Sequence, residues 1–429
     1  MTSAPLSQTQ RYFLDVLLDD GFDPTWQHVT TAFSFPAELD PERARAAASE
    51  VATRHPILHT RLDYDAGTAL LVPCADAETP YTTVDLRQAG DRELDLWVSH
   101  FLDQPFDLGA GPLWRFAVVA GAGRTVWALA AHHLVADAAS LWLVSKDLIL
   151  RSFEEDLDLP GPPFADFLAE EEELLSGPVG RERLAYWTEQ LEGASPAVIT
   201  EQRPRPHEVS SGVALPVKFA ADAGDALQRE ARARRVTPLP LLAAHVFTAV
   251  KRATDEDDVL CGVVTDLRGQ RYTTTVGPFT DVMLVRDRVA LGEDEAQRLT
   301  QIRNAFFIGW QQQLPVAYLR AHLPALGDGP DRTPNPCDLL LNFLPAPPAA
   351  DWQRMMGVCG EATPALCFPR HRLSAPAKRF HAPLYIFLFA LIERLDGWIY
   401  AHRRAELAEL NAVVAEQLQL AVSSLTAVA

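Results

Sequence analysis

The sequence predicts an α/β protein with two large lobes, and three observations lead to this prediction. The chain has 429 residues, which is more than one hydrophobic core usually organises and enough for two. Segments with strand patterns alternate with segments of helical pattern in both halves. The pattern breaks at Ser176–Gly180 (SGPVG), after an acidic stretch. We therefore expect an N-terminal lobe over residues 1–177 and a C-terminal lobe over residues 178–429.

The first half is predicted to contain helices and strands in alternation. Asp40 followed by Pro41 is a typical helix start, because aspartate caps the first free N–H groups and proline suits the first turn. Strands are indicated by β-branched and aromatic residues. The predicted elements are a helix at 6–18, a strand at 26–35, a helix at 40–58, short strands at 70–73 and 81–86, a helix at 92–106, two strands within 112–134 and a helix after Asp137.

The second half repeats this alternation of helices and strands. The predicted elements are a helix near 184–191, a strand at 213–219, one helix over 223–254, a strand at 258–265, a proline- and glycine-rich loop at 323–336, strands at 337–344, 383–395 and 397–403, and a terminal helix.

Composition excludes several classes of protein. Hydrophobic residues make up 48% of the chain and charged residues 22%, which is typical of a globular protein. The net charge of -19 argues against a nucleic-acid partner, whose phosphates would be repelled. The N-terminus lacks the features of a signal peptide, and the longest apolar run, 383–392, is too short to span a membrane. Five scattered cysteines without CxxC spacing indicate reduced thiols in a cytoplasmic protein and no structural zinc.

The stretch AHHLVADAAS (Ala131–Ser140) places two adjacent histidines at the end of a predicted strand. Successive side chains of a strand point to opposite faces, so His132 and His133 are poorly placed to bind one metal ion. They can be core histidines, with Asp137 as the N-cap of the following helix. Alternatively, one imidazole can accept or guide a proton in a cleft, with small residues beside it leaving room for substrate. Spacing alone leaves these two interpretations open.

The stretch HHLVADA (His132–Ala138) resembles the HHxxxDG motif of the condensation-domain superfamily of nonribosomal peptide synthetases. This superfamily also includes carrier-dependent acyltransferases that esterify polyketides. Further segments resemble motifs of the family, in the family's order: PLSQTQRYF (Pro5–Phe13), RHPILHTRL (Arg54–Leu62), PFDLGAGPLWR (Pro105–Arg115), LAYWTEQLEG (Leu184–Gly193), GVVTDLR (Gly262–Arg268) and VGPFTDVMLVR (Val276–Arg286).

The resemblance implies two lobes of the chloramphenicol acetyltransferase type, arranged in a V around a central tunnel, with segments of the second lobe crossing to the first. Phosphopantetheine arms of carrier proteins would enter this tunnel, and no cofactor would be bound permanently. His133 would face the tunnel and position or deprotonate the attacking group. His132 and Asp137 would be structural, and Asp137 would pair with Arg268 across the lobes. The tunnel would be lined by Ala138, Ser140, Gly277 and Asp281.

Three residues depart from the family pattern. Ala138 replaces the glycine of the histidine motif and adds a methyl group where the thioester is expected to pass. Asp281 replaces an asparagine, so it is expected either to recognise an amine-bearing acceptor or to be solvated. His59 replaces an arginine, with no clear consequence.

The resemblance predicts an acyltransferase of natural-product biosynthesis that forms an amide from a carrier-bound acyl or aminoacyl group and an amine. Alternatives are ester formation with an alcohol acceptor and a non-catalytic recruitment or gating domain. Because no adenylation or carrier segment is evident, the carrier is expected to act in trans. Candidate docking segments are 203–208 and 371–381. No GxSxG elbow occurs, and direct attack on the thioester needs no protein nucleophile.

Overall fold

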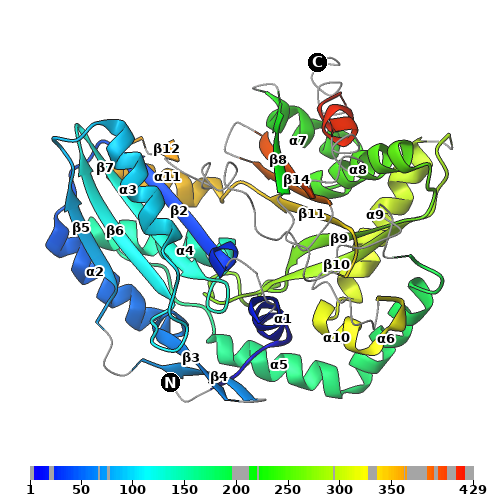
Figure 1. Cartoon of the computed structure of the whole chain (residues 1–429), viewed down its shortest axis with the longest axis horizontal. Coiled ribbons are helices and arrows are strands. Elements are labelled where there is room, and N and C mark those ends of the chain that lie inside the picture. Colours follow the sequence, from blue (N-terminus) through cyan, green and yellow to red (C-terminus); the bar gives the residue numbers. More distant parts are fainter. Residues whose placement is uncertain are drawn as a thin grey trace.

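The computed structural model describes residues 4–18, 24–65, 68–74, 78–195, 212–219, 222–292, 295–326, 336–361, 363–364, 384–390, 395–402 and 412–420. Two large sheets lie side by side, with helices α1 (Gln8–Leu17) and α5 (Phe164–Ser176) below the region where they approach each other (Figure 1). No helix in these ranges has both the length and the apolar character needed to cross a membrane.

The sheet of the first half has five strands, and it carries the histidine motif. In order across the sheet these are β12 (Thr363–Pro364), β2 (His28–Phe35), β7 (Arg124–His132), β6 (Trp114–Gly121) and β5 (Tyr81–Asp85). Strand β7 pairs antiparallel with both of its neighbours, and His132 lies opposite His28 in β2. The motif therefore begins at the end of a central strand.

Helices cover both faces of this sheet, and the alternation of side chains along β7 explains why. Trp127 and Leu129 pack in one core with residues of the two helices on one face, whereas Val126 and Ala128 pack in a separate core with the helix on the other face. The two helices of the first face are α2 (Pro41–Arg54) and α4 (Ala138–Ser152), and the helix of the opposite face is α3 (Asp91–Asp103).

A small sheet of three strands lies beside the first half. Its order is β1 (Ala4–Pro5), β4 (Thr68–Pro73) and β3 (Thr60–Asp65). Helix α1 follows β1 directly and starts with a capping box, in which the Ser7 and Gln10 side chains each accept a hydrogen bond from the other's backbone N–H. This cap fixes where α1 begins, next to the histidine motif.

The sheet of the second half has six strands. In order they are β10 (Thr280–Asp287), β9 (Val259–Asp266), β11 (Leu339–Leu344), β13 (Leu384–Ala390), β14 (Leu395–His402) and β8 (Gly212–Lys218). The helices packed around it are α6 (Pro178–Gln190), α7 (Ala223–Ala233), α8 (Pro238–Thr254), α9 (Glu295–Gln311) and α10 (Val316–His322), and a further helix covers 412–420. The sheet is mixed, because β11 runs parallel to both of its neighbours whereas the other strand pairs are antiparallel.

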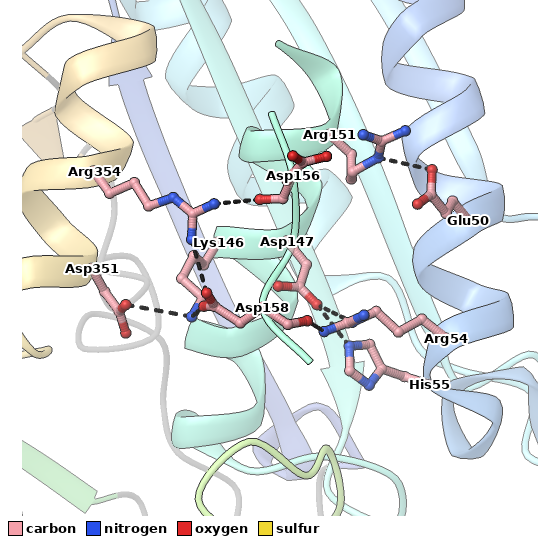
Figure 2. Close-up of polar contacts among 10 residues, drawn as sticks. All are labelled: Glu50, Arg54, His55, Lys146, Asp147, Arg151, Asp156, Asp158, Asp351 and Arg354. Atoms are coloured by element: carbon pink, nitrogen blue, oxygen red, sulfur yellow. Dashed lines mark hydrogen bonds and ion pairs between the residues drawn. The ribbon is translucent and has the colours of Figure 1, made fainter. Parts of the chain in front are cut away.

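A segment late in the chain packs on the first half. Helix α11 (Ala349–Cys359) lies against α4, and β12 pairs antiparallel with β2. Lys146 of α4 donates to Asp158 (2.8 Å) and to Asp351 of α11 (3.4 Å), and Arg354 of α11 also binds Asp158 (3.0 Å; Figure 2). The rings of Trp142 and Trp352 stack beside this network, with centroids 6.0 Å apart. Both ion pairs and an aromatic contact therefore hold α11 against the first half.

Several details differ from the sequence prediction. The predicted single helix over 223–254 is wrong: it is two helices, α7 and α8, separated at residues 234–237. Arg235 has a left-handed backbone there (φ 57°), and Pro238 cannot continue a preceding helix because it lacks an N–H. Across the predicted break at Ser176–Gly180 the chain stays almost fully helical, with only Gly177 between α5 and α6. The lobe boundaries remain a prediction.

Candidate active site

The His133 side chain follows the last residue of β7 and is held in place from two sides. Its backbone N–H donates to the carbonyl oxygen of Gln27 (2.8 Å), in the turn that leads into β2. Its imidazole stacks on the ring of Phe13 in α1, with centroids 4.6 Å apart and planes inclined by 28°. The side chain is half-buried. The ring therefore has a defined orientation and retains some exposure.

Burial keeps the His133 ring uncharged. Burial lowers the pKa of His133 to about 4, and the negative charge of Asp137 offsets only part of this effect. Because the pKa lies well below 7, the imidazole is neutral at physiological pH and has a lone pair available. It can accept a hydrogen bond or a proton from an approaching amine or alcohol.

His132 lies in different surroundings on the opposite face of the sheet. It is 1% exposed, and its Nδ1 accepts a hydrogen bond from the N–H of Leu134 (3.1 Å). The neutral ring therefore carries its proton on Nε2. Phe106 meets it edge-on, with centroids 6.2 Å apart. Burial lowers the pKa of His132 to about 3, with a further contribution from His133. This neutral ring helps to shape the turn that carries His133.

Asp137 and Arg268 form a buried ion pair between the motif and the second half. Arg268, which follows β9, donates Nη1 to Oδ2 (2.7 Å) and Nη2 to Oδ1 (2.6 Å) of Asp137. The carboxylate also accepts from the backbone N–H groups of Ser140 and Phe279. Burial alone would raise the pKa of Asp137, but the guanidinium and the two backbone N–H donors together outweigh it, and the pKa is lowered. The pair expected from the resemblance is therefore present, and it also caps α4.

Ser140 and Gly277 lie within this junction and not on an open surface. The Ser140 hydroxyl donates to the carbonyl oxygen of Gly277 (2.7 Å) and accepts from the N–H of Gly277 (2.9 Å) and from Arg268 Nη2 (2.6 Å). Ser140 is fully buried, and a Cβ added to Gly277 would meet the ring of Phe164 at 2.3 Å. Ala138, the first residue of α4, is half-buried. That these three residues line a tunnel remains a prediction.

Asp281 is buried in β10, so the prediction of a solvated carboxylate is wrong. It is 4% exposed and accepts hydrogen bonds from the N–H of Val282 (2.6 Å), the N–H of Val316 at the start of α10 (3.2 Å) and the hydroxyl of Thr9 in α1 (3.3 Å). Burial raises the pKa of Asp281 to about 7, although these donors act to lower it. The side chain therefore joins three elements.

Sequence reasoning did not single out two residues of α1 that adjoin the motif. Phe13 carries the ring that stacks on His133, and Gln10 donates Nε2 to the carbonyl oxygen of Leu134 (2.7 Å). Both belong to the segment Pro5–Phe13, whose resemblance to a family motif was the available signal. Among the residues described, no group of three or more His, Cys, Asp or Glu side chains could hold a metal ion. The two candidate docking segments, 203–208 and 371–381, lie outside the described residues.

The chain shares sequence with large peptide synthetases. The condensation-domain family matches residues 1–326. A linear gramicidin synthase of Brevibacillus parabrevis is 27% identical over 325 residues, which is 72% of this chain and 6% of that protein. A plipastatin synthase of Bacillus subtilis (strain 168) is 26% identical over 321 residues, which is 72% of this chain and 12% of that protein. The chain thus spans a small part of these relatives.

Solved structures share the fold over almost the whole chain. The condensation domain of the monacolin K polyketide synthase MokA superposes with a TM-score of 0.77 and 17% identity, covering 99% of this chain and 97% of that one. SgcC5 from Streptomyces globisporus gives a TM-score of 0.75 and 19% identity, with 98% and 99% covered. The X-domain from teicoplanin biosynthesis gives a TM-score of 0.74 and 18% identity, with 98% and 95% covered.

The paired α/β sheets, with the HHxxxD motif between them, are the fold of condensation domains. The chain belongs to the condensation-domain family. Condensation domains of peptide synthetases act on substrates carried by the phosphopantetheine of carrier proteins and use no permanent cofactor. Membership supports a role in condensation by acyl transfer.

Proposed function

We propose that this chain catalyses transfer of an acyl or aminoacyl group from the phosphopantetheine thioester of a carrier protein to an amine. The amine nitrogen attacks the thioester carbon and forms a tetrahedral intermediate. The C–S bond then breaks, the nitrogen loses one proton, and the departing sulfur gains one. The products are an amide and the free thiol of the carrier.

One observation carries this proposal: the neutral, half-buried imidazole of His133 at the junction of the two halves. A neutral ring can hold the attacking N–H and take its proton as the C–N bond forms, a contribution typically worth about 10²–10⁴-fold in rate. Two contacts support this role because they restrict motion before substrate arrives. The ring of His133 stacks on Phe13, and the backbone N–H of His133 donates a hydrogen bond to the carbonyl oxygen of Gln27. The Asp137–Arg268 pair supports it by holding the following turn.

One residue favours a second candidate function, a condensation-like domain that binds a carrier without turnover. Ala138 stands where the family motif has glycine, and its methyl group lies at the first position of α4, directly after the motif aspartate. If this methyl group blocks the thioester, carrier binding would persist without product. The same experiment separates the two functions.

The test incubates carrier proteins loaded with a panel of acyl groups with free or carrier-bound amines and alcohols, and follows them by intact-protein mass spectrometry. We expect loss of the acyl group from the carrier together with an amide product. An ester formed only with alcohols would identify the ester-forming variant. Tight carrier binding without turnover of any acceptor would favour the recruitment function.

The panel is repeated with His133→Ala, and with His100→Ala as the matched control. His100 is an exposed histidine in the last turn of α3, so its loss should leave product formation unchanged. We expect His133→Ala to form at least tenfold less product. Equal product from wild type and His133→Ala would remove this side chain from the mechanism.

A further inference from the structure

A cavity of about 530 Å³ lies between α5, α6, the end of α9 and the loop that follows β9. Its volume falls within the range of small-molecule sites, roughly 300–1,000 Å³. Its lining includes Phe167, Glu171, Phe307, Trp310 and Gln313.

The outer wall of the cavity is aromatic and unusually exposed. Phe307 and Trp310 are 61% and 63% exposed. They stand three residues apart on α9 and therefore share one face of the helix. The Phe167 ring, which is buried, closes the α5 side. Such walls suit the apolar body of a small ligand and the face-on approach of a cation.

Two buried side chains of the cavity have polar atoms without a partner. Glu171 uses Oε2 to accept from the N–H of Gln8 (2.9 Å), but its Oε1 has no hydrogen-bond partner among the described residues. Gln313 likewise has an unpartnered Nε2. Both residues are 8% exposed. Buried polar atoms are normally satisfied, so an acceptor and a donor without protein partners at one cavity are available to a polar ligand.

Two other arginines of the cavity are already paired with carboxylates. Arg271 binds Asp166 and Glu170, and Arg268 binds Asp137 and Asp266. Arg183 donates to the backbone oxygen of Gln313 (2.9 Å). Within the described part of the chain Glu171 takes part in no ion pair, and burial raises the pKa of Glu171 to about 7. A cationic group beside it would favour its ionised form.

We propose that this cavity binds a small primary amine with an apolar or aromatic side chain and a neighbouring carbonyl group, as in an α-amino acid amide. The ammonium group binds Oε1 of Glu171, the carbonyl oxygen accepts from Nε2 of Gln313, and the side chain lies against Phe307 and Trp310. This binding site goes beyond the acyl transfer proposed at His133 and does not depend on it.

The test measures binding of L-phenylalaninamide to the full chain by calorimetry and by tryptophan fluorescence. The matched neutral probe is 3-phenylpropanamide, which has the same skeleton without the amine. We expect saturable binding of the amine and at least tenfold weaker binding of the neutral probe. Trp310→Phe should abolish the fluorescence change and retain the calorimetric signal.

Glu171→Gln removes the charge but can still accept from Gln8, and we expect it to weaken binding at least tenfold. The matched control is Glu172→Gln, which alters the next, exposed residue of α5 outside the cavity. His133→Ala should bind like wild type, so a failure of acyl transfer and a failure of this site are separate results. Equal affinity in Glu171→Gln and wild type, or no saturable signal up to about 5 mM, would overturn the proposal.

Discussion

At the scale of single residues, Asp281 shows how burial changes the chemistry of a side chain. Its carboxyl group is surrounded by Val282, Val316 and Thr9, and its pKa is raised to about 7. Below that pH it is neutral and resembles the asparagine that the family pattern leads one to expect. The departure from the pattern is therefore smaller than the charge of a free aspartate suggests.

We predict that Asp281→Asn reduces the loss of stability that occurs as pH rises from about 4 to about 7. In this window the unfolded carboxyl group, with a pKa near 3.9, has released its proton while the folded one still holds it. Stability contributed by the neutral form is therefore lost as pH increases. A difference of about three pKa units corresponds to roughly 4 kcal/mol.

The measurement is the free energy of unfolding in urea at pH 4.5 and pH 7.5. The control is Asp95→Asn, an exposed residue of α3, which should keep the wild-type dependence. The same pH dependence in Asp281→Asn and wild type would show that Asp281 is ionised in the folded protein.

At the scale of elements, α11 joins the late part of the chain to the first half. Trp352 stacks on Trp142 and approaches Phe33 of β2, with centroids 6.2 Å apart. Ion pairs also link α11 to the first half, and they join Lys146, Asp158, Asp351 and Arg354 (Figure 2). Because aromatic burial dominates such contacts, the tryptophan should matter more than any single ion pair.

We predict that Trp352→Ala speeds hydrogen exchange across α11 by at least tenfold and leaves α8 unchanged. Loss of the ring removes the apolar contact that holds this element, so local opening becomes easier. The matched control is Trp97→Ala, because Trp97 stacks on Phe101 within α3 and packs against the core on the α3 face of the sheet. Unchanged exchange in α11, or equal acceleration in α8, would contradict this account of how the segment is held.

Local chemistry explains which elements the sequence predicted well. Helices with a capping residue and a neighbouring proline or glutamine, such as those that start after Ser7 and Asp40, were placed to within a few residues. The break at Arg235 was missed although Pro238 and Pro240 follow it, and proline is a typical signal for the end of a helix. The position of α11 was not predictable from local patterns, because its neighbours in α4 are about 200 residues away in sequence.

At the scale of the whole molecule, the Asp137–Arg268 pair connects the two halves at the motif. We predict that Asp137→Asn lowers the free energy of unfolding by about 3–5 kcal/mol, because it removes the buried counter-charge of Arg268 and leaves only the half-exposed carboxylate of Asp266. Urea denaturation measures this. Asp85→Asn breaks the exposed Asp85–Arg87 pair and serves as the control, with little change expected. Equal effects of the two substitutions would contradict a structural role for Asp137.

The candidate site was predictable only in part, because several of its contacts join segments that are far apart in the sequence. Adjacent histidines and an N-cap aspartate could be identified in His132–Asp137, and the resemblance supplied the pairing with Arg268. The contact of Phe13 with His133, and the way Ser140 and Gly277 bond to each other, depend on the approach of segments more than a hundred residues apart. Residue spacing carries no information about such approaches.

The most direct test of acyl transfer at His133 is a single-turnover rate measurement, made with loaded carrier, excess enzyme and saturating acceptor. Carrier binding is measured on the same samples. We predict that His133→Ala slows transfer by about 10²-fold or more and leaves carrier binding unchanged. Transfer at the wild-type rate in His133→Ala would contradict the account.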